Sequence, residues 1–261
     1  PRPGTLLEDN GWSADLNVGT GDIVRLVAPN GRVIEGRAGS LLGYRHESYD
    51  SAELQRHLDS YLQHRDEWAI LDHDKPGLAN AHTAHTAVFT PTHLGVGLDG
   101  NTAIAELPSD ARSQLGGPAR HELSIRGVDS QRVEVTLVLR DKPANRMPEA
   151  GFLTLTPEGA ENWSLLKMGL WHDGLNMARR GGGQLQAVEA VRTMTRAGEL
   201  EISLLDPALV APASTPFMPF QSGVPDYGGG VRVNLYNNKW GTNFPMWWEG
   251  TAVFRVVFTL A

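Results

Sequence analysis

The chain contains no cysteine among its 261 residues. This absence excludes disulfide bonds, thiolate catalysis, iron–sulfur clusters and zinc sites built on cysteine, although it does not fix the cellular compartment. The chain also lacks an apolar run of the roughly 18 residues that a membrane-spanning helix requires. Its first residues, Pro1 to Gly4, have no apolar signal core behind them. We therefore expect the chain as given to be soluble, with no membrane partner.

Positive charge is in the minority, with 23 Lys and Arg against 30 Asp and Glu and a formal net charge of -7. This balance argues against nonspecific binding to a phosphate backbone or to an anionic membrane surface, so we expect no nucleic-acid partner. The Gly-x-Ser-x-Gly elbow of serine hydrolases is missing as well. Gly228-Gly229-Gly230 precedes a strand pattern rather than a helix, so it cannot cradle a phosphate group.

Strand patterns dominate what is present. Apolar and polar side chains alternate with a period of two, as in half-buried strands, over residues 122–126, 132–139, 152–156, 200–205, 231–236 and 253–260. The 29 glycines and 16 prolines supply many turns. Runs of strands without alternating helices favour antiparallel sheets. The sequence predicts an all-β fold, an antiparallel β-sandwich or super-sandwich formed by a single domain over residues 1–261.

One segment has helical spacing instead. Apolar residues recur at intervals of three and four at Leu54, Leu58, Tyr61 and Leu62. Asp50 precedes them as a candidate N-cap, and Glu53 follows three residues later, as in a capping box. This predicts one main helix over about 51–66.

A short hairpin is also indicated. Residues 23–27 and 32–35 read as strands on either side of Pro29-Asn30-Gly31. Asn-Gly is favoured in tight turns because its residues accept positive φ angles. Residues 184–191 are ambiguous between helix and strand, and their β-branched residues favour a strand.

The most unusual segment is the aromatic loop, residues 235–248, which joins two strand patterns. It contains three Trp, one Phe and three Asn, where an ordinary connection needs only two to six turn residues. Aromatic faces stack on the apolar faces of sugars, and amides exchange hydrogen bonds with hydroxyl groups. The alternative is an ordered loop whose Trp residues plug the end of a sandwich. The candidate substrate-binding residues are Asn237, Asn238, Trp240, Asn243, Trp247 and Trp248.

The string Asn-Asn-x-Trp-Gly-Thr-Asn-Phe-Pro-x-Trp at 237–247 resembles the C-terminal end of a bacterial family related to the family 38 glycoside hydrolases, the α-mannosidase type. Other blocks fit in the same order, at 42–45 with 48–50, 74–77, 142–150 and 206–212, and Phe254-Arg255 follows in the last strand. The resemblance implies a β super-sandwich that contributes sugar-binding loops to a glycoside hydrolase-like enzyme. In that type the catalytic groups lie mainly in an α/β barrel, which is not present here. A catalytic barrel domain or partner chain would then complete the active site around a glycan or glycoside.

Two other functions remain open. The chain can be an autonomous sugar-acting lyase or epimerase, with His46, Tyr49 and Asp50 as candidate catalytic residues, because such chemistry needs a base beside a charge-neutralising partner. It can also be a structural interaction domain whose aromatic loop is an interface plug. Three further carboxylates adjoin the matched blocks or the aromatic loop, namely Glu149, Asp173 and Glu249. No two carboxylates form a recognisable glycosidase pair.

Candidate metal ligands lie in one histidine-rich segment. The imidazoles of His73, His82 and His85 and the carboxylates of Asp72 and Asp74 lie within fourteen residues. The segment lacks the His-Glu-x-x-His pattern that adds a general base to a metal, and it reads as a loop. We expect neither a metal nor another cofactor.

Overall fold

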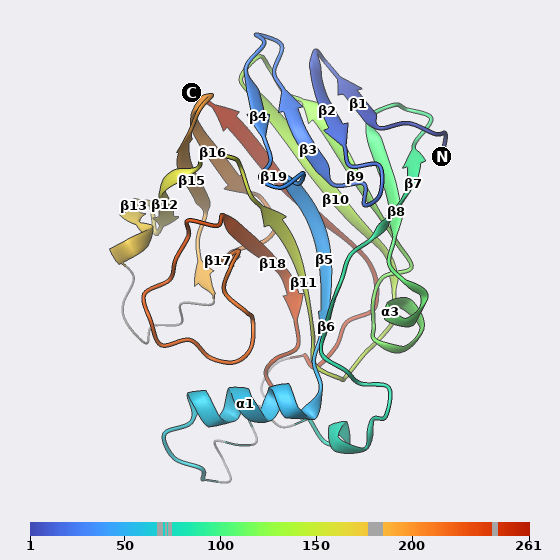
Figure 1. The fold of residues 1–261 in the computed structure, drawn as a ribbon, viewed down its shortest axis with the longest axis vertical. Helices are drawn as coiled ribbons and strands as arrows, with labels where there is room; N and C mark the ends of the chain where they lie inside the picture. The colour runs from blue at the N-terminus through green and yellow to red at the C-terminus, as the bar shows by residue number, and fades with distance from the viewer. Residues whose placement is uncertain (67–69, 71, 73–74, 177–184, 242–244) are drawn as a thin grey trace.

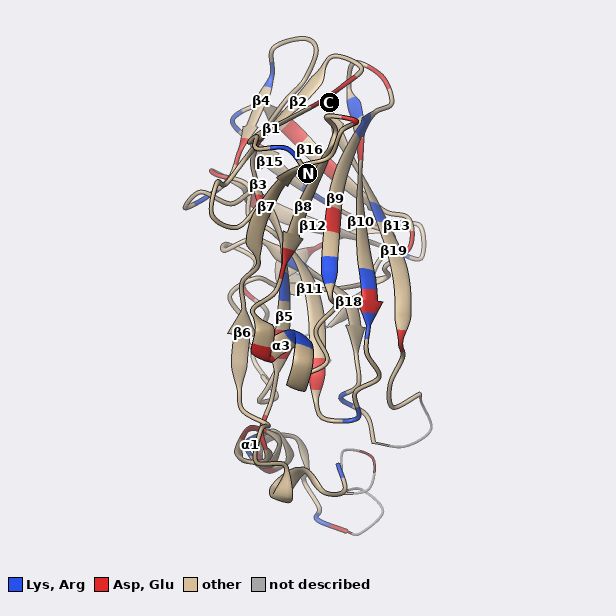
Figure 2. Ribbon diagram, turned by 90° about the vertical axis from the view of Figure 1, so that its right-hand side faces the viewer, with Lys and Arg blue, Asp and Glu red and all other residues tan. Residues whose placement is uncertain are grey.

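Two antiparallel sheets account for most of the architecture of the computed structural model (Figure 1). The structure describes residues 1–66, 70, 72, 75–176, 185–241 and 245–261. Every strand pair in these residues is antiparallel, as the alternating pattern predicts. Side chains of both sheets contribute to one core, and Figure 2 shows the molecule after a quarter turn from Figure 1. The all-β sandwich expectation is confirmed.

The first sheet has ten strands in the described residues. Its path runs through β1 (Leu6–Asp9), β2 (Trp12–Leu16), β3 (Ile23–Val27), β5 (Leu42–Ser48), β11 (Glu149–Leu155), β18 (Val231–Asn237), β17 (Leu209–Pro212) and β14 (Gln186–Ala187), while β4 (Val33–Glu35) pairs with β3 and β6 (Ala87–Phe89) with β5. Strands from both halves of the chain therefore lie side by side at its centre, where β11 pairs with both β5 and β18.

The second sheet has nine strands in the described residues. Its order is β13 (Leu170–Asp173), β12 (Glu161–Lys167), β15 (Ala190–Thr195), β16 (Gly198–Leu204), β19 (Gly250–Leu260), β10 (Arg132–Lys142), β9 (Arg120–Gly127), β8 (Thr102–Glu106) and β7 (Thr92–Val96). The two long strands β10 and β19 pair over most of their length, with one irregularity between Leu139 and Lys142. All six strand segments expected from the period of two are confirmed.

The main core fills the space between the sheets. Side chains such as Trp12 and Leu153 from the first sheet meet Val135 and Phe258 from the second, all 1% exposed or less. A smaller apolar cluster includes Tyr49, Leu54, Phe152 and Phe217. Because Phe152 and Leu153 are successive strand residues and point to opposite faces, this second cluster covers the outer face of the first sheet.

Helix α1 (Ser51–Tyr61) begins where the sequence predicts, and Asp50 Oδ1 accepts a hydrogen bond from the Glu53 backbone N–H at 2.9 Å. The predicted extent to residue 66 was wrong, because Leu62 is already extended and no further apolar residue continues the stripe. A second helix, α3 (Ser109–Gln114), was missed, since six residues are too few to display a helical period. Two single turns of 3-10 helix, η1 (Leu78–Asn80) and η2 (Gly174–Asn176), complete the described helices, none of which could cross a membrane.

The predicted hairpin is present, with Leu26 opposite Ile34. The Gly31 N–H donates to the Ala28 carbonyl at 2.9 Å, so Pro29 and Asn30 are the central residues of the turn. Among these turn residues only Gly31 has a positive φ, of 82°. The ambiguous segment 184–191 contains β14 and the start of β15, so the strand preference is confirmed for its described residues.

Candidate functional site

Buried polar side chains gather at the end of the sandwich where β5, β11 and β18 approach α1, at the bottom of Figure 1. Strand β5 contributes to both faces of the first sheet, since Tyr44 and His46 alternate with Arg45 and Glu47. Two groups result. The interior cluster consists of Tyr44, His46, Lys142, Asn145, Glu149 and Tyr236, and the outer cluster consists of Glu47, Tyr49, Phe217, Arg232 and Lys239.

A hydrogen-bonded chain runs through the interior cluster. The hydroxyl oxygens of Tyr44 and Tyr236 are 2.7 Å apart, Tyr236 Oη is 2.9 Å from His46 Nδ1, and His46 Nε2 is 2.8 Å from the Leu115 carbonyl oxygen. A carbonyl can only accept, so His46 carries its proton on Nε2 and Nδ1 accepts from Tyr236. Tyr44 must then donate to Tyr236. Burial lowers the pKa of His46 to about 4, which keeps the imidazole neutral and this order fixed.

The Leu115 carbonyl links this chain to a buried ion pair. Asn145 Nδ2 donates both to that carbonyl, at 3.2 Å, and to Glu149 Oε2, at 3.2 Å. Lys142 Nζ donates to Glu149 Oε1 at 2.6 Å, and the two side chains are 0% and 1% exposed. Burial raises the pKa of Glu149 to about 7, although Lys142 opposes this shift. Both the protonated and the ionised form of the Glu149 carboxyl group are therefore populated near neutral pH.

The space around Glu149 leaves room only for glycine at position 116. Gly116 has φ 80°, and an added Cβ would lie 2.2 Å from Glu149 Oε2 and 2.6 Å from Asn145 Nδ2. Both the backbone angle and the contact exclude a larger residue.

A further cation reaches this end of the fold from outside the sheets. Lys75 is 4% exposed, and its Nζ donates to the Trp240 carbonyl at 3.2 Å. Burial lowers the pKa of Lys75 to about 8, while the charge of Glu149 opposes the shift. Lys75 therefore binds the aromatic loop at Trp240 and also interacts electrostatically with Glu149.

The outer cluster is held by a second buried ion pair. Arg232 Nη1 donates to Glu47 Oε1 at 2.9 Å, and the Tyr49 hydroxyl donates to Glu47 Oε2. Burial raises the pKa of Tyr49 well above its ordinary value, so the hydroxyl stays protonated. Lys239 Nζ lies 5.1 Å from the centre of the Phe217 ring and forms no hydrogen bond or ion pair within the described residues. Burial lowers the pKa of Lys239 to about 8.

The structure separates the three candidate catalytic residues. His46 is buried in the interior cluster, whereas Tyr49 belongs to the outer cluster. Asp50 caps α1. The three do not converge on one point, and both ring nitrogens of His46 are already occupied. The residues that sequence reasoning did not single out are the buried charges Glu47, Lys75, Lys142, Arg232 and Lys239. Alternation could not have revealed Lys142, because the period of β10 turns inward at Leu137 and Leu139, and only the irregularity between Leu139 and Lys142 brings Lys142 inside.

The aromatic loop divides into a buried part and an exposed part. Asn238 Oδ1 accepts from the Glu149 backbone N–H at 2.8 Å, and Trp248 packs edge-on against Tyr236 with ring centres 5.5 Å apart. Asn237 Nδ2 donates to Asn234 Oδ1 at 2.7 Å. Trp240 and Trp247 are 38% and 40% exposed, and the Arg146 guanidinium lies 4.1 Å from the centre of the Trp247 ring. Asn243 lies outside the described residues.

Metal ligands do not gather in the residues that the structure describes: no three His, Cys, Asp or Glu side chains are placed to hold an ion. His82 and His85 are exposed, and His73 lies outside the described residues. The absence of a metal stays a prediction.

No family model and no curated protein matches the chain. Two solved structures resemble it over 97% of both chains: an Escherichia coli K12 protein named as a candidate aldose 1-epimerase, with 12% identity and a TM-score of 0.44, and a C. elegans GalM/aldose epimerase homologue, with 8% identity and a TM-score of 0.43. Both likenesses extend over a whole chain, not the C-terminal portion of a longer enzyme. The expected membership in an α-mannosidase-related hydrolase family was therefore wrong, and the expectation of a barrel domain or partner chain loses its basis. At these identities and TM-scores, no activity transfers to this chain.

Proposed function

We propose that this chain is an autonomous acid–base enzyme that acts on a sugar, of the epimerase or lyase kind. The observation that carries the proposal is the Glu149 carboxyl group, whose pKa burial raises to about 7 although Lys142 forms an ion pair with it and the charge of Lys75 acts on it. A general base works best when its pKa lies near the operating pH. Lys75, with a pKa lowered to about 8, is a matching acid.

Anomeric epimerisation is the simplest reaction for such a pair. Glu149 takes the proton of the anomeric hydroxyl, the bond between the anomeric carbon and the ring oxygen breaks, and Lys75 gives a proton to that oxygen. The anomeric carbon becomes a carbonyl in the open-chain sugar. Rotation of the carbonyl and the reverse proton transfers close the ring with the opposite configuration. No redox partner is needed, because no atom changes its oxidation state over the full cycle.

The aromatic loop would supply the sugar contacts. Trp240 and Trp247 expose enough ring surface to stack on a pyranose, and Lys75 joins the loop at the Trp240 carbonyl. Asn237, Asn238, Asn243 and Trp248 remain proposed substrate-binding residues, of which Asn238 and Trp248 also shape the surroundings of Glu149. His46 would position Tyr236 beneath Lys142, whose Nζ lies 5.3 Å from the Tyr236 ring centre.

One observation favours a different function. Glu149 and Lys142 are almost completely buried, as in an ion pair that only fixes the end of a fold. The chain would then be a structural interaction domain with the aromatic loop as its contact surface.

The test is interconversion of pure anomers of glucose, galactose and mannose, followed by polarimetry. We expect acceleration by the native protein and a loss of at least about a hundredfold in Glu149→Gln, the scale of general acid–base catalysis. Glu249→Gln is the matched control, since that exposed carboxylate adjoins the aromatic loop. Two results together would favour the structural interaction domain instead. The native protein would accelerate neither these reactions nor elimination from a uronic-acid glycoside, and Glu149→Gln would only lower the melting temperature.

A further inference from the structure

Lysine is scarce in this chain, and its amines lie in different surroundings. The four lysines are Lys75, Lys142, Lys167 and Lys239. Nζ of the first donates to the Trp240 carbonyl at 3.2 Å, that of the second to Glu149 Oε1 at 2.6 Å, and that of the third to Gln186 Oε1 at 2.6 Å. Lys239 differs from these three, because its Nζ has no hydrogen-bond acceptor and no ion-pair partner in the part of the chain that the structure describes.

The surroundings of Lys239 are aromatic rather than acidic. The residue is 8% exposed, and its Nζ lies 5.1 Å from the centre of the Phe217 ring. Phe217 packs in turn against Tyr49, with ring centres 5.8 Å apart. Glu47, the carboxylate of the outer cluster, is already bound by Arg232 and by the Tyr49 hydroxyl. Buried ammonium groups are normally paired with an opposite charge, so the position of Lys239 is exceptional.

The amine of Lys239 nevertheless reaches the surface. Some polar side-chain atoms among the described residues are fully enclosed and have no partner, and Lys239 Nζ is not one of them. Because Nζ has no partner either, it must keep contact with solvent. The apolar stem of the side chain is therefore enclosed, while the amine stays within reach of a small solute.

The same surroundings favour the neutral form of the amine. Burial lowers the pKa of Lys239 to about 8, and no charge of a described residue opposes the shift. The pKa of Lys75 is also lowered to about 8, but there the charge of Glu149 favours the ammonium form. Near pH 7 such a pKa increases the neutral fraction on the order of a hundredfold over that of an ordinary lysine. The neutral amine is the form that attacks carbonyl groups.

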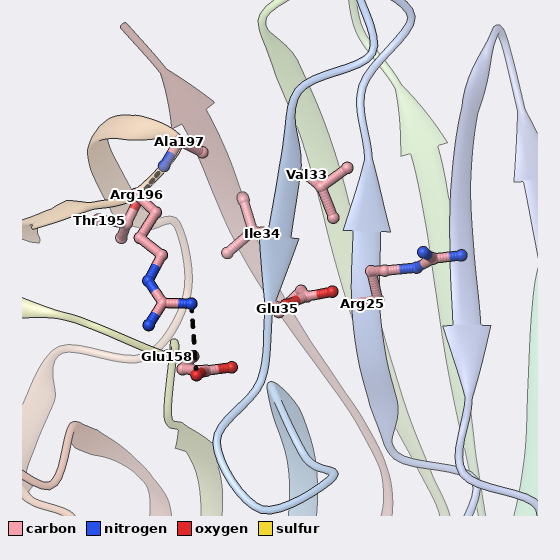
Figure 3. A pocket seen from close by; sticks show the side chains of 8 residues that line it. All are labelled: Arg25, Val33, Ile34, Glu35, Glu158, Thr195, Arg196 and Ala197. Carbon is pink, nitrogen blue, oxygen red and sulfur yellow. Dashed lines mark hydrogen bonds and ion pairs between the residues drawn. The ribbon is translucent and has the colours of Figure 1, made fainter.

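The hollow of Figure 3 offers no comparable nucleophile. It has a volume of about 270 Å³ and lies between β4 and the turn that joins β15 to β16. Arg25 and Arg196 line it together with Glu35 and Glu158, and Arg196 Nη1 is 3.6 Å from Glu158 Oε1. Guanidinium groups stay protonated at neutral pH and do not react as amines.

We propose that Lys239 is a carbonyl-reactive lysine, at which a small aldehyde such as an open-chain aldose condenses to a Schiff base. The lone pair of Nζ attacks the carbonyl carbon, and the carbonyl oxygen takes one proton of the amine to give a carbinolamine. This oxygen then leaves as water with the second proton of the amine, and a C=N bond replaces the C=O bond. The step needs no oxidant or reductant. It does not depend on the activity proposed at Glu149, because the aldehyde can come from solution.

Reductive trapping tests the proposal on the full chain. The protein is treated at pH 7 with millimolar glycolaldehyde and cyanoborohydride, which reduces an imine to a stable secondary amine, and peptides are mapped by mass spectrometry. Glycolaldehyde is too short to form a sugar ring, so a failure of the proposed epimerase activity leaves this result unaffected. We expect Lys239 to be modified at least tenfold faster than Lys142 and Lys167, and faster than Lys75. The proposal is overturned if any other lysine reacts as fast.

Unfolding and two variants locate the cause. In guanidinium chloride the four lysines should react at similar rates, since the preference comes from burial; a preference for Lys239 that survives unfolding would overturn the proposal. Lys239→Arg keeps the positive charge and should abolish the fast phase of incorporation. Lys167→Arg is the matched control and should leave that phase unchanged. A fast phase that persists in Lys239→Arg, or disappears in Lys167→Arg, would place the reactive amine elsewhere and overturn the proposal.

Discussion

His46 and Asn145 donate hydrogen bonds to the same atom, the carbonyl oxygen of Leu115, at 2.8 and 3.2 Å. This shared acceptor joins residues from β5 and from the segment between β10 and β11 to the end of α3. It makes the tyrosine–histidine chain and the Lys142–Glu149 ion pair one continuous network. The network fills this end of the sandwich with polar side chains that hydrogen-bond to one another. Apolar side chains in the same place would provide no titratable group.

Tyr236 has more partners in this network than Tyr44, and its loss should cost more. Tyr236→Phe removes the donor to His46 Nδ1 and the acceptor of the Tyr44 hydroxyl, leaving two buried groups unpaired. We expect it to lower the free energy of unfolding by roughly 2–4 kcal/mol, against about 1 kcal/mol for Tyr44→Phe. Urea unfolding measures both variants. Equal losses would mean that the two hydrogen bonds of Tyr236 do not both contribute to stability.

Glu149 should make the protein less stable as the pH rises. Its pKa is 4.5 in the ordinary case and about 7 in the fold, so the folded state holds a proton that the unfolded state has released. The stabilisation is complete below about pH 4.5 and is lost as the pH rises through about 7, by an amount on the order of 3 kcal/mol. His46 and His121, with pKa values lowered to about 4, act in the opposite direction as the pH falls below 6.5.

The measurement is therefore the difference between the native protein and Glu149→Gln, each unfolded by urea at several pH values from 4.5 to 8. The histidine contribution is common to both and cancels. The advantage of the native protein should shrink across this range, and a difference that is independent of pH would contradict the raised pKa.

Gly31 should be required for stability only because its backbone has a positive φ. Nothing lies within 4 Å of a Cβ built at this position, yet its φ is 82°. We expect Gly31→Val to lower the free energy of unfolding by roughly 1 kcal/mol or more, because a β-branched residue resists positive φ. Gly223→Val is the control, since Gly223 has open space and no positive φ. An unchanged unfolding midpoint in Gly31→Val would rule out strain at the turn.

Trp240 and Trp248 should respond differently to truncation. Trp240 is 38% exposed, so Trp240→Ala should cost little stability but should weaken sugar binding by roughly 1–3 kcal/mol, by analogy with bases stacked on aromatic rings. Trp248 packs against Tyr236 and the main core, and its replacement by Ala should cost roughly 3 kcal/mol of stability. Tryptophan emission during titration with mannose, galactose and glucose measures binding. A large loss of stability in Trp240→Ala, with no response of the native protein to any sugar, would assign the loop a structural role.

A chelator should leave the melting curve unchanged. Metal bound only to the folded state would stabilise it through linkage, and the candidate ligands His82 and His85 are exposed. Calorimetry with and without chelator, together with elemental analysis, checks this. A melting temperature several degrees lower in chelator, or near-stoichiometric zinc, would reveal a metal site.

The sequence by itself determined the fold class, the main strands, the hairpin and the start of α1. These depend on alternation, turn residues and capping, which are encoded within a few neighbouring residues, as at Asp50 and Gly31. It did not determine the end of α1 or the existence of α3, because the end of a short helix is set by packing as much as by pattern.

Only the tertiary structure decided how the polar residues are grouped. Glu149 meets Lys142 because the chain reverses between β10 and β11, and it is enclosed because residue 116 is a glycine. His46 and Tyr49, three residues apart, lie in different clusters because His46 points to the inner side of β5, whereas Tyr49, which follows the end of the strand, packs against Phe217 on the outer side. The elevated pKa of Glu149 arises from burial, and burial depends on every element packed around the carboxyl group, so no local pattern could have revealed it.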